Sequence, residues 1–260
     1  MDLGLGGKVV VVTGGAKGIG AAIVRAAAAE GMITVIVDRD AAAGAELAAA
    51  LRSTGHTVEV VTAALDEAEA CAEVVATVMV RCGRIDALVN NAGVNDGVGL
   101  ANGSPAAFAA SLERNLSHYY AMAHHALPAL TASRGCIVNI ASKVALTGQG
   151  GTSGYAAAKG AILALTREWA VELLPAGIRV NAVVPAEVMT PLYEQWLATH
   201  PDPAAKLAGI VTKIPLEQRM TTAEEIAATV IFLLSSKSAH TTGQQLHVDG
   251  GYVHLDRAIH

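Results

Sequence analysis

The length, composition and charge of the chain exclude several classes of protein. Its 260 residues are 52% hydrophobic and 16% charged, which is typical of a globular protein with a substantial core and not of a disordered chain. The formal net charge is −5 and no run of basic residues occurs, so a dedicated nucleic-acid or anionic-membrane surface is not expected.

Short β-branched runs alternate with long alanine-rich stretches along the chain. This alternation predicts right-handed βαβ units and an α/β fold in which a parallel sheet is covered by helices on both faces. No linker or repeat divides the chain, so we expect a single domain over 1–260. The predicted strands are 8–12, 34–37, 58–62, 87–89, 136–140, 179–184 and 245–248, and the predicted helices are 18–30, 41–53, 67–82, 105–112, 116–130, 154–174 and 222–234.

One long segment, 185–221, interrupts the alternation. It is rich in proline and carries the aromatic residues Tyr193 and Trp196. Long insertions in compact domains are usually functional, and ligands of open α/β sheets bind beyond the carboxyl ends of the strands. We therefore expect a substrate loop at about 185–221.

A glycine-rich loop, Thr13 to Gly20, joins the first predicted strand to the first predicted helix. Glycine allows a tight turn and a close approach of the backbone to a pyrophosphate, and the following helix offers free N–H groups and a positive dipole end. In this context the loop predicts a dinucleotide site. The loop residues expected to contact the cofactor are Gly14, Lys17, Gly18, Ile19 and Gly20.

The end of the second predicted strand carries opposing signals about the cofactor. Asp38 is placed to accept hydrogen bonds from the adenosine ribose, which favours NAD. Arg39 and Lys17 could instead pair with the 2′-phosphate of NADP. Asp38, Arg39 and Asp40 also fit a solvated strand end that caps the next helix. The sequence leaves the choice between NAD and NADP open.

The strongest chemical signal is a tyrosine and a lysine one helical turn apart, Tyr155 and Lys159. A tyrosine with its ordinary pKa near 10 is a poor base at neutral pH. An ammonium about 4 Å away would favour the phenolate by roughly 4 kcal/mol at an effective dielectric near 20. Ser142 follows the strand 136–140 and could orient a substrate oxygen. Alone, the pair also fits an amphipathic helix with a snorkelling lysine.

Five motifs in this order resemble those of the short-chain dehydrogenase/reductase family: the glycine loop 13–20, the Asn-Asn-Ala-Gly stretch 90–93, Asn115, Ser142 and the Tyr-x-x-x-Lys pattern 155–159. The resemblance implies a Rossmann-type fold with a doubly wound sheet of about seven strands. It implies that Tyr155 is the general acid/base, that Lys159 binds the nicotinamide ribose and that Asn115 holds a water. It also implies a cofactor groove lined by Asn91, Ala92, Gly93, Val188 and Thr190.

Two positions depart from the family pattern. Where the family often has Asp-Val after the third strand, this chain has Ala64-Leu65, so Leu65 would contact adenine through its backbone. Where the family commonly has Pro-Gly after the sixth strand, this chain has Pro185-Ala186-Glu187. A carboxylate beside the nicotinamide pocket suits a ligand rich in hydroxyl groups.

The stretches 185–193 and 248–258 are similar to those of L-fucose dehydrogenase-type members of the family. This implies oxidation of a sugar hemiacetal to its lactone, with Glu187, Asn95 and Gln149 as candidate ligands of the sugar. A carbonyl reductase of a hydrophobic ketone, of the 3-oxoacyl or steroid type, and a non-catalytic NAD(P)-binding regulator stay open as alternatives.

Targeting and metal signals are missing from the sequence. No apolar run approaches the roughly 18–20 residues of a membrane helix, and the first residues lack the pattern of a secretory signal. The cysteines and histidines occur at no metal-ligand spacing. We expect a cytoplasmic protein without a metal site and, from the family resemblance, a homotetramer.

Overall fold

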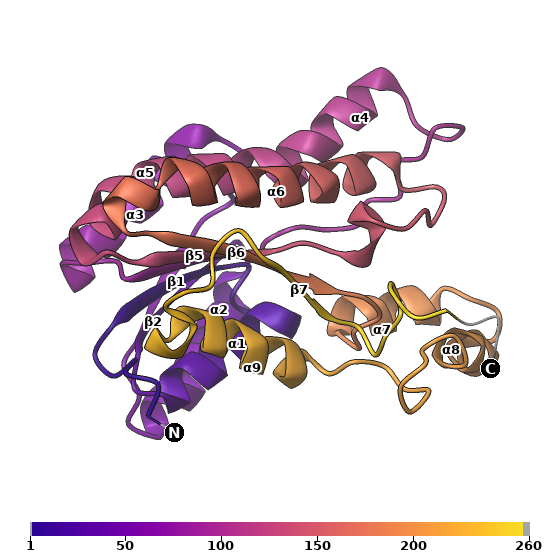
Figure 1. Cartoon of the computed structure of the whole chain (residues 1–260). Coiled ribbons are helices and arrows are strands. Elements are labelled where there is room, and N and C mark those ends of the chain that lie inside the picture. Colours follow the sequence, from indigo (N-terminus) through magenta and orange to yellow (C-terminus); the bar gives the residue numbers. More distant parts are fainter. Residues whose placement is uncertain (1, 257–260) are drawn as a thin grey trace.

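The structure, a computed structural model, describes residues 2–256 and contains one parallel sheet of seven strands. The strand order is β3-β2-β1-β4-β5-β6-β7 (Figure 1), which confirms the predicted Rossmann-type arrangement. The chain runs outward from β1 to one edge and from β4 to the other, so the order reverses between β1 and β4. The strands are β1 Val9–Thr13, β2 Ile33–Asp38, β3 Val58–Thr62, β4 Ala87–Asn90, β5 Cys136–Ile140, β6 Arg179–Pro185 and β7 Gln245–Val248.

Helices cover both faces of the sheet (Figure 1). Alternate residues of β1 reach the two resulting cores: Val10 and Val12 join one cluster, and Val9 and Val11 join the other. Burial on both faces explains why this strand is apolar throughout. One layer holds α1 Gly18–Ala29, α2 Ala41–Ser53 and α9 Ala223–Leu234, and the other holds α3 Ala68–Cys82, α4 Pro105–Leu112, α5 His118–Ser133 and α6 Ser153–Glu172. None of the helices within 2–256 is long and apolar enough to span a bilayer.

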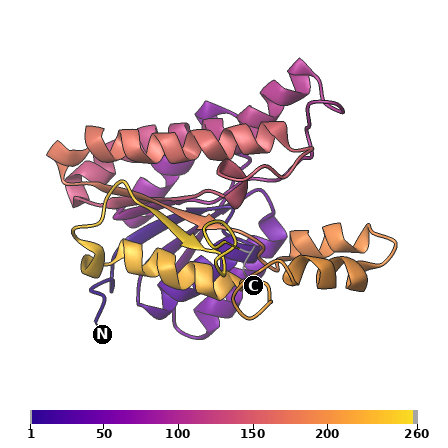
Figure 2. The same cartoon turned by 45° about the vertical axis from the view of Figure 1, so that its right-hand side comes forward.

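The segment after β6 is not the loop that the sequence predicted. It contains two short helices, α7 Pro191–Ala198 and α8 Pro203–Val211, which project as a hairpin from the edge of the molecule (Figure 2). Each helix starts with a proline, and the preceding residue accepts a hydrogen bond from the first turn: Thr190 from the Tyr193 amide at 3.2 Å and Asp202 from the Ala205 amide at 2.9 Å. Proline fits the first helical turn, since the amide it lacks would be unpaired there.

The two ends of this segment are tied together. Val188 and Thr221 form an isolated parallel bridge. The Thr221 amide donates to the Glu187 carbonyl at 2.9 Å, and the Met189 amide donates to the Thr221 carbonyl at 3.3 Å. The residues between them therefore form a closed insertion at the carboxyl end of the sheet.

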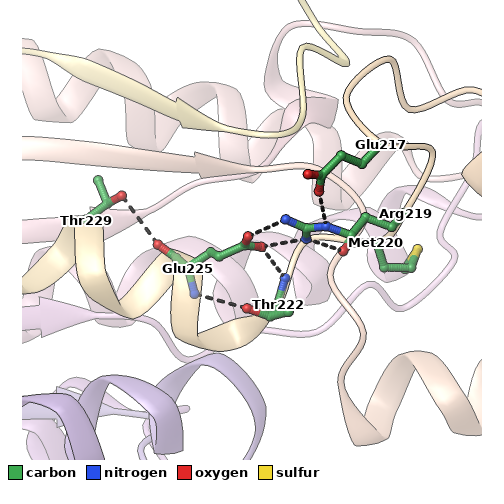
Figure 3. Close-up of polar contacts among 6 residues, drawn as sticks. All are labelled: Glu217, Arg219, Met220, Thr222, Glu225 and Thr229. Atoms are coloured by element: carbon green, nitrogen blue, oxygen red, sulfur yellow. Dashed lines mark hydrogen bonds and ion pairs between the residues drawn. The ribbon is translucent and has the colours of Figure 1, made fainter.

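A network of hydrogen bonds around Arg219 links the end of this insertion to helix α9 (Figure 3). The Arg219 guanidinium donates to both carboxylate oxygens of Glu225, at 2.6 and 3.0 Å, and to Glu217 at 2.6 Å. Glu225 also accepts from the Thr222 amide at 2.8 Å within a capping box. These contacts lower the pKa of Glu225 to about 2, with the Arg219 hydrogen bond as the largest cause.

Candidate active site

A cleft of about 840 Å³ opens at the carboxyl ends of the strands. This is the position where open α/β sheets bind ligands, and the volume suits a small-molecule or cofactor site. Its wall is built from the glycine loop, the ends of β2, β4 and β5, helix α6 and the segment after β6. Of the residues predicted to hold the cofactor, the cleft brings together Gly14, Lys17, Gly18, Ile19, Asp38, Arg39, Leu65, Asn91, Ala92, Gly93, Tyr155, Lys159, Val188 and Thr190.

Gly20 lies behind the cleft wall and makes the turn possible. A Cβ at this position would collide with the carbonyl oxygen of Gly14. Gly14 itself has a φ of +61°, and a Cβ there would lie 2.9 Å from the Cα of Ala92. Both positions therefore require glycine. No side chain caps the N-terminus of α1 in the described structure, so its first amides are free to bind a pyrophosphate.

Asn91 holds the glycine loop in place. Its side-chain amide donates to the carbonyls of Thr13 and Gly14 at 2.9 and 3.0 Å. The Thr13 hydroxyl in turn accepts from the backbone amides of Asn91 and Ala92 at 2.9 and 3.1 Å. Thr13 was not among the predicted site residues, although it begins the glycine motif. The loop is thus fixed in shape by protein contacts alone, which suits a dinucleotide cradle.

Acidic and basic side chains lie close together at the end of the cleft that is predicted to hold the adenosine. The Asp38 carboxylate accepts from the amides of Ala16 and Asp40, each at 3.0 Å. Lys17 is paired with Asp40 at 2.5 Å, whereas Arg39 is exposed. Two backbone amides therefore orient the Asp38 carboxylate, and Lys17 and Arg39 both lie in the wall of the cleft.

Tyr155 and Lys159 both lie on α6 and both face the cleft. Burial raises the pKa of Tyr155 to about 12, and a hydrogen bond with Ser142 opposes this shift. Burial also lowers the pKa of Lys159 to about 7. The lowered tyrosine pKa that the sequence predicted is wrong: the Lys159 Nζ lies 5.5 Å from the centre of the Tyr155 ring, and burial is the largest cause of the shift in the Tyr155 pKa.

Lys159 has two inner hydrogen-bond partners. Its Nζ donates to the Ile140 carbonyl at 2.8 Å and to the Tyr119 hydroxyl at 3.0 Å. Tyr119 is completely buried on α5, and its hydroxyl donates to the same Ile140 carbonyl at 2.9 Å. Tyr119 was not predicted as a site residue, because an aromatic residue on a helix is normally a core residue. The lysine is therefore held by a phenol from a neighbouring helix.

Asn115 is buried in a π-helical turn, Glu113–Ser117, that the sequence did not predict. Its side-chain oxygen accepts from the Val94 amide at 2.8 Å, and its side-chain nitrogen donates to the Ser111 carbonyl at 3.1 Å. Single π-turns inside helices are frequently found at functional sites. Asn115 fixes the loop after β4, and its predicted role in holding a water stays a prediction.

A largely buried ion pair involves the residue that follows Ser142. Lys143 follows Ser142 directly, and its ammonium pairs with Glu187. The other Glu187 oxygen accepts from the Tyr193 hydroxyl at 2.9 Å, while the Lys143 Nζ lies 4.0 Å from the centre of the Tyr252 ring. Lys143 was missed by the sequence reasoning, because its partner lies far along the chain.

The other two predicted sugar ligands lie elsewhere. Asn95 and Gln149 are both exposed, and neither they nor Glu187 are among the residues that line the cleft. The Asn95 side chain accepts from the Gly97 amide at 3.3 Å within its own loop. Their predicted contacts with substrate stay predictions.

Comparisons with known proteins agree with this geometry. Residues 14–253 match the family described as "Enoyl-(Acyl carrier protein) reductase". The chain is 39% identical to an L-fucose dehydrogenase of Bos taurus over 246 residues, which cover 94% of this chain and 89% of that protein. It is 34% identical to the 3-oxoacyl-[acyl-carrier-protein] reductase FabG of Thermotoga maritima over 250 residues, 96% of this chain and 99% of the relative.

Solved structures of dehydrogenases share the whole fold. The crystal structure of Cj0485 dehydrogenase superimposes with a TM-score of 0.94 at 48% identity and covers 99% of this chain and 98% of the other. The aldohexose dehydrogenase of Thermoplasma acidophilum superimposes with a TM-score of 0.88 at 28% identity, with the same coverage.

Proposed function

Because the chain belongs to the short-chain dehydrogenase/reductase family and is an NAD(P)-dependent oxidoreductase, we propose that it oxidises the anomeric hydroxyl of a sugar. L-Fucose or an aldose of related ring stereochemistry is the proposed substrate, and the lactone is the product. A homotetramer is the proposed assembly.

The proposed reaction breaks two bonds of the hemiacetal. The hydrogen on C1 leaves as hydride, for which a bound oxidised nicotinamide supplies the acceptor, and the hydroxyl proton passes to the Tyr155 oxygen. The C1–O bond becomes the lactone carbonyl. Ser142 is placed to donate a hydrogen bond to the same oxygen. Lys159 in its ammonium form stabilises the phenolate that accepts the proton.

The observation that carries the sugar proposal is the Lys143–Glu187 pair. Both side chains are largely buried, with exposed fractions of 7% and 13%. Lys143 follows Ser142 in sequence, and Glu187 accepts a hydrogen bond from Tyr193; Ser142 and Tyr193 line the cleft. Carboxylate and ammonium groups can exchange hydrogen bonds with several sugar hydroxyls. An apolar chain packed against them would gain no such contacts and would remove their remaining exposure to water. The similarity to an L-fucose dehydrogenase and to an aldohexose dehydrogenase supports the same substrate class.

A second candidate is a reductase of acyl or other hydrophobic ketones. It is favoured by the identity to the 3-oxoacyl reductase and by the description of the matching family. An apolar wall next to Ser142 would suit such a substrate, whereas Lys143 follows Ser142 directly and pairs with Glu187.

A spectrophotometric screen tests the proposal. Aldoses, including L-fucose, L-galactose and D-arabinose, are incubated with NAD⁺ and with NADP⁺, and 3-oxoacyl and steroid ketones with the reduced cofactors. We expect oxidation of aldoses and a rise of at least tenfold in KM for the Glu187→Gln variant. Glu194→Gln, an exposed glutamate in the same insertion, is the matched control. Turnover of ketones alone would contradict the proposal, and cofactor binding without any turnover would favour a regulator.

A further inference from the structure

We propose that Tyr119 is a positioning residue of the reaction, whose phenol oxygen holds the Lys159 ammonium beside Tyr155. The proposal concerns the oxidoreductase chemistry of the family and does not depend on the sugar assignment. It goes beyond the four motif residues, because Tyr119 belongs to none of the motifs.

The hydrogen-bond pattern fixes the role of the Tyr119 oxygen. Its single proton is donated to the Ile140 carbonyl at 2.9 Å. The oxygen is therefore an acceptor toward the Lys159 Nζ, 3.0 Å away. Lys159 also donates to the Ile140 carbonyl, so two of its three donors are used on the inner side and the third is left for the cleft. The hydrogen bonds among Tyr119, Ile140 and Lys159 therefore fix the position of the Lys159 ammonium.

The surroundings of Lys159 make this acceptor important. His118, next to Tyr119 on α5, has a pKa lowered to about 4 by burial and by Lys159, so it is neutral near pH 7. Tyr155 on α6 is protonated at that pH, and Ser142 at the end of β5 is uncharged. Among the described residues no carboxylate pairs with Lys159. The buried ammonium is thus stabilised by neutral oxygen acceptors.

Loss of the Tyr119 oxygen has a specific consequence for the Tyr155–Lys159 pair. In the relevant state, only one of Tyr155 and Lys159 is protonated. The pair is then either phenolate with ammonium, which can accept the substrate proton, or phenol with neutral amine, which cannot. Removing an acceptor of the ammonium shifts the balance toward the second form. The Ile140 carbonyl still holds the Lys159 ammonium and Tyr119 does not touch the phenolate, so the pKa of Tyr155 beside a charged Lys159 stays the same.

The test measures the titration of Lys159 directly and needs no substrate. The protein is treated with trace acetic anhydride across a pH series, and acetylation of Lys159 is followed by peptide mass spectrometry, because only the neutral amine reacts. We expect half-maximal reaction near pH 7 in the wild type and a midpoint lower by about one unit in Tyr119→Phe. Tyr120→Phe, an exposed neighbour, is the control and should match the wild type.

The pH dependence of turnover gives a second readout, with the alcohol or aldose that the screen identifies. For Tyr119→Phe we expect kcat/KM to match the wild type at acid pH and to level off about tenfold lower above the midpoint. A uniform loss at every pH, or an unchanged Lys159 midpoint, would overturn the proposal. If the Tyr119→Phe variant does not fold, the Tyr119→Met variant, which also lacks the oxygen, is used in its place. Failure of the sugar assignment leaves the labelling result intact.

Discussion

Lys143 and Glu187 join two connections of the sheet that are 44 residues apart in sequence. Lys143 lies in the turn after β5, directly behind Ser142, and Glu187 lies at the start of the insertion after β6. Their ion pair therefore couples the position of Ser142 to the position of the insertion after β6.

This coupling predicts an unequal effect of single and double substitutions. Lys143→Met or Glu187→Met alone leaves a buried charge without its partner, and we expect each to lower the free energy of unfolding by about 3–5 kcal/mol. The double variant removes both charges and should recover most of that loss. Urea unfolding measures all three, with Glu194→Met as the control. Additive losses in the double variant would show that the ion pair is not the cause.

Tyr155→Phe should separate binding from chemistry. The ring still fills its place, so the affinity for NADH, measured by fluorescence titration, should stay within about twofold of the wild type. The proton acceptor is lost, so kcat should fall by at least about 10². Substantial residual kcat would contradict the assignment of Tyr155 as the acid/base residue.

Lys159 should make the free energy of unfolding depend on pH. Its pKa is lowered in the folded protein, from 10.5 to about 7, so between these values the unfolded chain binds more protons. Stability must then rise with pH over this range, by up to about 1.4 kcal/mol per unit. Lys159→Met should remove this rise between pH 7 and 10, whereas Lys206→Met, an exposed lysine, should not. Parallel profiles for wild type and Lys159→Met would refute the lowered pKa.

Asp38 should determine the choice of cofactor. Its carboxylate is oriented by two backbone amides and would repel a 2′-phosphate, so we expect NAD⁺ to be preferred to NADP⁺. Asp38→Ser removes the repulsion while the exposed Arg39 stays. The ratio of kcat/KM for NADP⁺ to that for NAD⁺ should rise at least tenfold. Adding Arg39→Met should reverse the gain, and an unchanged ratio would remove Asp38 from this role.

The Arg219 network should control local opening of the insertion more than global stability. Its side chains are exposed, and exposed pairs contribute little to folding. Arg219→Met should nevertheless speed cleavage by thermolysin within 203–221, because it removes the contacts that link Glu217 to Glu225 on α9, with a small change in Tm. Arg81→Met breaks another exposed pair and serves as the control. Equal cleavage rates would contradict the role of Arg219.

The sheet and its helices were largely predictable because the strands are buried on both faces and read as short apolar runs. The predicted bounds of 41–53, 58–62, 105–112, 136–140 and 245–248 coincide with those of α2, β3, α4, β5 and β7. Helices α7 and α8 were missed because they are short, with eight and nine residues, and lie in a proline-rich segment that favours a loop. Their N-cap residues followed by proline, Thr190-Pro191 and Asp202-Pro203, were the available signal.

The cofactor side of the site was predictable because its contacts are local: glycines at a turn, and a tyrosine and a lysine on one helix. The contacts that were missed join distant parts of the chain. Tyr119 meets Lys159 across two helices, and Lys143 meets Glu187 across two loops. The pKa of Tyr155 could not be predicted either, because it depends on desolvation, which only the packed structure defines.

The bridge between Val188 and Thr221 has a consequence for how this fold can diversify. Because the two ends of the insertion are joined at the sheet, the entropy of closing it grows only slowly with its length. Residues of the insertion that do not line the cleft can be added, removed or exchanged without changing a strand or the glycine loop. The insertion can therefore vary in size while the sheet and the Tyr155–Lys159 helix stay the same.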